Sequence, residues 1–494
     1  NITKAALAEQ SGFVLDQLQT RFFYSDKQAY LKALYLKTPG TELKRSIVIR
    51  YNSLAALQKD IGHIHLDLDI AHSKIGVKDI LTFVPSLSSQ PAFANPNTTW
   101  LIHSSMSGTV DDLQIPTLQI SGWKDTRLDI SGTITGLPDM NKTAVDLTIK
   151  NISSSQRDIA LLIPQGTLPQ NITLPSQMSL YGKLHGNTGK LIGDLNLKSS
   201  LGNAFLKARM EKITNPDQSV YDLQLNTAAL DLGTILQDTA NLGPVSADFH
   251  IQGNGYDPQT ANASLSGKIR SAIIRQYEYR DLNLKGTIAR QQATVHADIA
   301  DPNIHFSADA MADLAKAYPS LQLNARIDSI KTRALHLTGD ELIYRGNIQG
   351  DFANTNPDSL DGKLFILESL LVHNQQRVQM DTIQLLAGIN DSSARYIQLN
   401  SDVVKAQLRG RYKLTELGSV FEQAIQPYFN FTDTGSVKQP EPYDFNIHAN
   451  IINGPALKAF VPQLEKMDSI TCKSRFSSNE GWDAALNAPV VHMG

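Results

Sequence analysis

A six-residue phrase recurs along this chain of 494 residues. Three copies begin at Ser179, Ser264 and Ser359 and read Ser-Leu-x-Gly-Lys followed by Leu or Ile, and a looser copy begins at Ser105. Successive copies start 74, 85 and 95 residues apart (179−105, 264−179 and 359−264). Alternate side chains of a strand share a face, so each copy predicts a strand with one apolar face. A recurring strand predicts a repetitive array, and such arrays more often present long surfaces than compact catalytic sites.

Alternation of apolar and polar residues extends this pattern through most of the chain. Turn signals such as Asn-Gly and Asp-Pro separate the alternating segments, and long helical patterns between strands are missing. The sequence therefore predicts an all-β, mostly antiparallel fold, an elongated and repetitive U-shaped groove with a few short helices at its edges. The chain reads as one continuous fragment of a longer array, with approximate repeat units at 1–104, 105–178, 179–263, 264–358 and 359–494.

Short helices are predicted where a second phrase occurs. Phe-Val-Pro-x-Leu stands at 83–87 and again at 460–464, and each copy follows apolar residues at helical spacing. Weaker apolar stripes cover 232–236 and 417–425. Helices this short are marginal alone, so we expect them to dock on the rim of an apolar sheet.

The interior of the predicted groove is assigned to the apolar faces of the repeated strands. Glycines within these strands indicate bends or close backbone approach, which would curl the sheet into a trough. A closed β-sandwich, in which the same side chains fill a core, is the alternative. The candidate lining residues are Leu180, Leu184, Phe249, Ile251, Leu265, Ile269, Leu282, Leu284, Leu360 and Leu364.

Composition excludes several classes of protein. The formal net charge is −3, which is unlike the basic stripe of a nucleic-acid-binding protein. Cys472 is the only cysteine, so no disulfide forms within the chain. No apolar run approaches the ~18 residues of a membrane-spanning helix. The nucleotide-binding and hydrolase signatures are missing from the sequence, so we expect neither an enzyme nor a cofactor.

One segment contains residues that could bind a metal. His63 and His65 stand two apart, followed by Asp67 and Asp69, and strand spacing would place all four on one face. Imidazole and carboxylate groups suit zinc or iron. The polar face of a half-buried strand has the same pattern, and no further His-rich motif stands nearby. We therefore predict no metal site here.

The repeated phrase and the short Phe-Val-Pro-x-Leu helices resemble the AsmA-like family, in particular its TamB branch in Bacteroidetes. The resemblance covers most of the chain and concerns the repeat pattern more than a unique signature. It implies a taco-like β-groove in the periplasm of a Gram-negative bacterium, which carries phospholipid between the inner and outer membranes. It also implies an inner-membrane anchor, missing here, and a BamA-like partner in the outer membrane.

Three functional hypotheses follow from these observations. The first is a groove that holds phospholipid acyl chains. The second is a scaffold for translocation and assembly of outer-membrane proteins, in which a partner strand pairs with a free sheet edge. The third, which has the least support, is a carbohydrate- or metal-dependent enzyme on the β-array, with a concave polar site of clustered acids and with activity that depends on His63 or His65.

Overall fold

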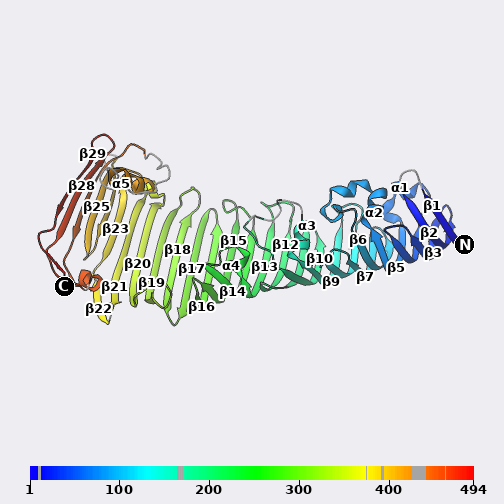
Figure 1. The fold of residues 1–494 in the computed structure, drawn as a ribbon, viewed down its shortest axis with the longest axis horizontal. Coiled ribbons are helices and arrows are strands. Elements are labelled where there is room, and N and C mark those ends of the chain that lie inside the picture. The colour runs from blue at the N-terminus through cyan, green and yellow to red at the C-terminus, as the bar shows by residue number, and fades with distance from the viewer. Residues whose placement is uncertain are drawn as a thin grey trace. The chain divides into compact units, whose positions relative to one another are not determined.

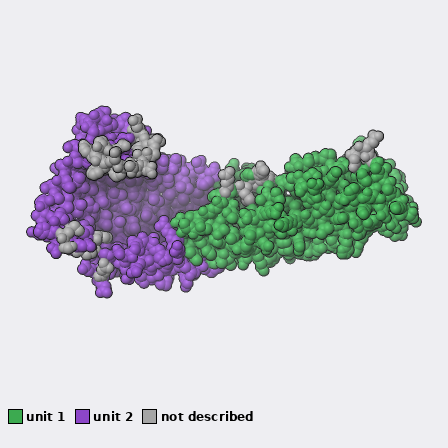
Figure 2. Space-filling model, viewed as in Figure 1, with its two compact units in different colours: residues 1–256, 272–274 green, residues 257–271, 275–494 purple. Residues whose placement is uncertain are grey.

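The computed structural model describes residues 1–8, 13–163, 166, 169, 171–373, 375–390, 394–425, 441–461 and 463–493. They form two compact units, coloured separately in Figure 2. Unit 1 comprises residues 1–256 and 272–274, and unit 2 comprises residues 257–271 and 275–494. Each unit is a mostly antiparallel, open β-sheet with a few short helices, which confirms the predicted fold class.

Unit 1 is a continuous meander (Figure 1). Each strand from β2 to β13 pairs antiparallel with the strand before it and the strand after it along the chain. The strands are β1 (Ile2–Ala8), β2 (Val14–Tyr24), β3 (Gln28–Lys37), β4 (Glu42–Arg50), β5 (His65–Gly76), β6 (Thr99–Thr109), β7 (Asp112–Ser121), β8 (Arg127–Thr135), β9 (Ala144–Ser155), β10 (Gln177–Asn187), β11 (Lys190–Ser199), β12 (Gly202–Glu211), β13 (Val220–Asp231) and β14 (Leu242–Asn254).

Unit 2 follows the same sequential pairing, with one branch where β21 pairs with both β22 and β23. Two short strands, β27 (Leu464–Met467) and β30 (Val491–Met493), form a separate pair. The other strands are β15 (Asn262–Ile274), β16 (Tyr277–Ala289), β17 (Gln292–Asp301), β18 (Ile304–Asp313), β19 (Ser320–Lys331), β20 (Leu342–Asn354), β21 (Asp361–His373), β22 (Gln376–Met380), β23 (Ile383–Ile389), β24 (Arg395–Asn400), β25 (Val404–Arg411), β26 (Asp444–Ile451), β28 (Ile470–Ser477) and β29 (Gly481–Asn487).

Four of the short helices lie where the sequence predicts them. They are α2 (Val77–Phe83), α4 (Leu232–Ile235), α5 (Leu417–Ile425) and α6 (Pro455–Phe460). α2 and α6 end alike, because Val84 and Val461 adopt nearly the same backbone conformation, with φ/ψ of −133°/73° and −127°/78°. Each valine precedes a proline, which disfavours continued helix. Pro462 itself lies outside the described residues.

The helices α1 (Ala56–Lys59) and α3 (Gln156–Leu162) have no counterpart in the sequence-based prediction. The sequence signal for α3 is Ser155, whose side chain caps the helix by accepting a hydrogen bond from the backbone N–H of Asp158. α2, α3 and α4 directly follow β5, β9 and β13. Alternate strands of an antiparallel meander run in the same direction, and β5, β9 and β13 are four strands apart. The three helices therefore follow strand ends on the same rim of unit 1.

Aspartates attach two of these helices to hairpin turns. The carboxylate of Asp158, 3% exposed, accepts hydrogen bonds from the backbone N–H of Asp125 at 2.7 Å and the hydroxyl of Thr126 at 2.9 Å. Asp79, at the equivalent third position of α2, accepts from the hydroxyls of Thr38 and Thr41 in another hairpin turn. Each helix therefore closes the end of a hairpin that precedes it in the chain.

The solvent-accessible surface area shows that little of the chain is packed in a buried core. The chain exposes 29052 Å², whereas a compact protein of 54.2 kDa would expose roughly 18,000 Å². Fully buried side chains are correspondingly few and include Val77, Leu335 and Phe445. The sheets are thus largely single-layered.

Two mid-strand glycines in unit 1 are required by their backbone. Gly132 and Gly182 have φ of +146° and +151°, and a Cβ on either would lie 2.0 Å or less from the carbonyl oxygen of Asp146 or Asp194 on the neighbouring strand. This confirms the expected close approach at these two positions. Gly286 differs, because a Cβ there would meet its nearest atom at an ordinary 3.4 Å.

We expect Gly132→Ala to destabilise the β8–β9 pairing by at least about 1 kcal/mol, because an L side chain is strained at positive φ. Amide hydrogen exchange in β8 should therefore accelerate about fivefold or more. Gly286→Ala is the matched control and should change local stability by no more than about 0.5 kcal/mol. Equal effects of the two variants would contradict the assignment.

Candidate functional site

Rows of apolar side chains cross the strands of unit 1. One row runs Ile130, Ile149, Gly182, Leu195, Leu206, Leu225, Phe249, and each neighbour in it is a registered cross-strand partner. A parallel row joins two predicted lining residues, Leu184 and Ile251, through Gly193, Ala208 and Leu223. Leu180 lies on the same face of β10. The structure therefore gathers the predicted residues of unit 1 on one apolar surface.

Unit 2 carries a longer row, which we call the Val295 row. It comprises Gly286, Val295, Ala310, Leu323, Gly350, Leu364, Leu385, Leu399, Ala406, Ala449, Cys472 and Leu486. None of its members carries a charged side chain. The row crosses twelve strands in register, so it forms an unbroken apolar line across the sheet.

The remaining predicted residues lie on or beside these rows. Leu265 is next to the Val295 row, because its Cβ lies 4.0 Å from the position of a Cβ on Gly286. Ile269 stands four residues further along β15, on the same face. Leu284 begins a row through Ala297, Ala308, Ala325 and Ile348, and Leu282 begins one through Ile299 and Phe306.

Leu360 differs from the sequence-based expectation of a strand residue. It follows the 3-10 turn Pro357–Ser359, and β21 begins only at Asp361. The asparagine and proline at 356–357 explain this, because Asn356 caps the turn by accepting a hydrogen bond from the backbone N–H of Asp358. In this copy of the repeat the strand therefore starts two residues after the initial Ser.

The exposure of the predicted lining residues distinguishes an open groove from a closed β-sandwich core. All ten are half-buried, whereas residues that fill a sandwich core would be buried. Polar residues on the opposite face, such as Lys285, Thr287 and Thr294, are exposed. The apolar faces are therefore left open and are not packed into the core of a closed sandwich. In Figure 2 the face of unit 2 that is turned to the viewer is visibly hollowed.

The helix α5 covers part of the apolar face of unit 2. Val420, 2% exposed, forms a cluster with Tyr412, Phe445 and Phe476. The ring of Phe421 meets the ring of Phe476 edge-on at 5.1 Å. Partly buried Ile397, Leu408 and Ile447, which lie in one row on β24, β25 and β26, pack against the cluster. α5 thus covers apolar surface that is left half-exposed elsewhere.

The structure does not place the two candidate metal ligands on one strand face. His63 belongs to the 3-10 turn Ile61–His63, and only His65 enters β5. His63 lies 2.5 Å from a carboxylate oxygen of Asp60, and this hydrogen bond raises the pKa of His63. Asp67 forms an ion pair with Arg50 at 3.0 Å. In the part of the chain that the structure describes, no three His, Cys, Asp or Glu side chains are grouped to hold a metal ion.

The opposite, polar face carries cross-strand pairs and shallow cavities. His250 and Asp222 lie 2.7 Å apart across two strands, as do His296 and Asp309. A cavity of about 480 Å³ lies in unit 2 over β15 to β19, and one of about 850 Å³ lies in unit 1 beside His103. Sequence reasoning missed these cavities, because they depend on the register between strands.

Comparison with known proteins adds no family assignment, because no protein-family model matches the chain and no curated protein matches it significantly. Among the helices that the structure describes, none has the length and apolar character needed to cross a membrane.

Alkaline pH should loosen the cluster beneath α5. Burial raises the pKa of Tyr412 from 10.0 to about 12, whereas an unfolded tyrosine titrates near ~10. Between these values the unfolded state has lost a proton that the folded state retains, so stability falls as pH rises. We expect the melting temperature to fall between pH ~10 and ~12, and to fall less in Tyr412→Phe. An equal fall in both proteins would contradict a buried phenol.

Proposed function

We propose that this chain is the groove of a bridge-like lipid transport protein, which carries phospholipid between the inner and outer membranes of a Gram-negative envelope. The observation that carries the proposal is the set of half-exposed apolar rows. The repeated Ser-Leu-x-Gly-Lys phrase, which resembles the TamB branch of AsmA-like proteins, supports the cellular setting. A BamA-like outer-membrane partner and an inner-membrane anchor belong to the same proposal.

Apolar rows of this kind suit acyl chains. Burial of one CH₂ group gains ~0.8 kcal/mol, so even a partly covered acyl chain is held firmly. Adjacent strands are ~4.8 Å apart, so an acyl chain that slides along the Val295 row meets an apolar side chain or glycine at each step. Transport then needs no catalytic group, and the polar headgroup stays in water at the rim.

A scaffold for outer-membrane protein assembly is the second candidate, and one observation favours it. All seven residues of β29 are exposed, and among the described residues this strand pairs only with β28. An open strand edge can accept an added strand from a partner. This function does not require lipid on the apolar rows.

Neighbouring residues on β17 offer a matched test of lipid binding. Val295 belongs to the apolar row and is 44% exposed, whereas Thr294 is exposed on the polar face. We expect Val295→Asp to retain about one tenth or less of the phospholipid bound by the unmodified chain, because a penalty of ~1.4 kcal/mol changes an equilibrium tenfold. Thr294→Asp should bind lipid normally. Bound lipid is measured by native mass spectrometry after incubation with phosphatidylethanolamine and phosphatidylglycerol vesicles.

A photo-crosslinking amino acid at each position makes the test independent of variant stability. Position 295 should crosslink to phospholipid and position 294 should not. If neither position crosslinks and the folded chain binds no lipid, the proposal of a lipid-binding groove is wrong and the assembly scaffold becomes the favoured function.

A further inference from the structure

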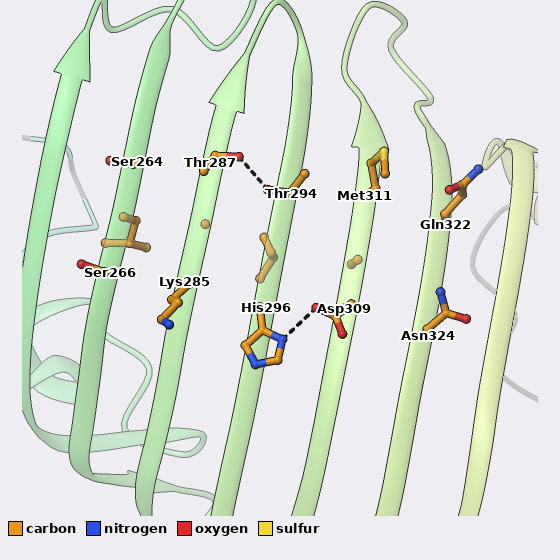
Figure 3. Close-up of a pocket in the computed structure, with 14 residues that line it drawn as sticks. Ser264, Ser266, Lys285, Thr287, Thr294, His296, Asp309, Met311, Gln322 and Asn324 are labelled. Carbon is orange, nitrogen blue, oxygen red and sulfur yellow. Dashed lines mark hydrogen bonds and ion pairs between the residues drawn. The ribbon is translucent and has the colours of Figure 1, made fainter.

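A second surface of unit 2 contains a cavity lined mainly by polar side chains. The cavity of about 480 Å³ draws its lining from β15, β16, β17, β18 and β19 (Figure 3). Ten of the lining residues alternate with the Val295 row along their strands, and four belong to or adjoin that row: Leu265, Gly286, Val295 and Ala310. The cavity therefore lies on the polar face, with strand backbone as its floor and two rows of side chains as its walls.

The two walls are registered across the strands. One wall runs through Thr287, Thr294, Met311 and Gln322, and the other through Lys285, His296, Asp309 and Asn324. Ser264 and Ser266 close the end of the cavity on β15. The labelled side chains in Figure 3 follow these two lines.

Hydrogen-bonding groups in these walls are largely left available. The pairs His296–Asp309 and Thr287–Thr294 are made at 2.7 and 2.6 Å. Within the described part of the chain, the side chains of Lys285, Ser264, Ser266, Gln322 and Asn324 make no hydrogen bond or ion pair.

Some polar side chains elsewhere on the same strands pair with one another. Asn283 donates to Asp298, and Lys268 pairs with Asp281.

The charge and the dimensions of the cavity restrict the class of ligand that fits it. Lys285 and Asp309 offset each other, so the walls favour an uncharged ligand over an anionic one. The cavity extends over five strands, about 19 Å, while its walls stand two residues apart on each strand, about 7 Å. An α-helix with side chains is about 10–12 Å across and does not fit.

An extended polypeptide fits poorly for another reason. Strands β17 to β19 are paired on both flanks, so their backbones offer few N–H or C=O groups to a peptide laid across them. A sugar hydroxyl both donates and accepts, and it can bond with serine, asparagine or glutamine side chains without a fixed strand register.

We propose that this cavity binds a linear, uncharged polysaccharide, with the chain running perpendicular to the strands. The amides of Gln322 and Asn324 and the hydroxyls of Ser264 and Ser266 bond with sugar hydroxyls. Met311, 45% exposed, contacts the apolar face of a sugar ring. The site is on the opposite face from the apolar rows and is independent of lipid binding.

Calorimetric titration of the whole chain tests the proposal with cellohexaose and chitohexaose as probes. We expect a hexasaccharide to bind at least about tenfold more tightly than its disaccharide, because the cavity crosses five strands. The double variant Gln322→Leu, Asn324→Leu should weaken hexasaccharide binding about tenfold or more, since several neutral hydrogen bonds are lost. Gln292→Leu, an exposed change on β17 outside the cavity, is the matched control and should bind normally.

Methyl resonances give a second readout in the unmodified protein. The methyl signal of Met311, assigned with Met311→Leu, should shift on addition of hexasaccharide. The proposal is overturned if neither hexasaccharide binds, or if the control loses as much affinity as the double variant. It is equally overturned if an uncharged extended peptide binds with the same dependence on Gln322 and Asn324 and the glycans do not.

Discussion

In-register antiparallel pairing is the constraint on which the rest of this structure depends. A shift of one residue between two strands would exchange the apolar and polar faces beyond that point. The Val295 row remains apolar across twelve strands because each pair is in register where the row crosses it. Irregularities in the β18–β19, β19–β20 and β20–β21 pairs lie elsewhere along those strands. Backbone hydrogen bonding therefore aligns the rows across the strands, and the side chains decide only whether a row is apolar or polar.

Glycines and short helices add local contacts between strands and turns in unit 1. Gly132 and Gly182 allow the backbone of a neighbouring strand to come closer than a side chain would permit. Asp79 and Asp158 attach helices to hairpin turns through hydrogen bonds that are partly or fully buried. Such local attachments matter in a single-layered sheet, because no second layer of packing holds the turns in place.

One face of the sheet is apolar and the other is polar. The apolar face is half-exposed along much of its length, and α5 shows that apolar side chains do dock on it, through Val420 and its aromatic neighbours. The polar face pairs many of its charges across strands but leaves amides and hydroxyls available over β15 to β19. Because successive side chains of a strand alternate, every strand of the array contributes to both surfaces.

Sequence alone determined the strands, their two faces and four of the short helices, because alternation with period two and apolar residues at helical spacing are local signals. It misplaced Leu360 and His63, where a 3-10 turn delays the start of the strand. Only the tertiary structure decided between a closed sandwich and an open sheet. The periodicity of a strand says that one face is apolar, but whether that face meets a second sheet or remains half-exposed depends on long-range packing. The cavity beside Gln322 and Asn324 required the register of five strands, which no single segment encodes.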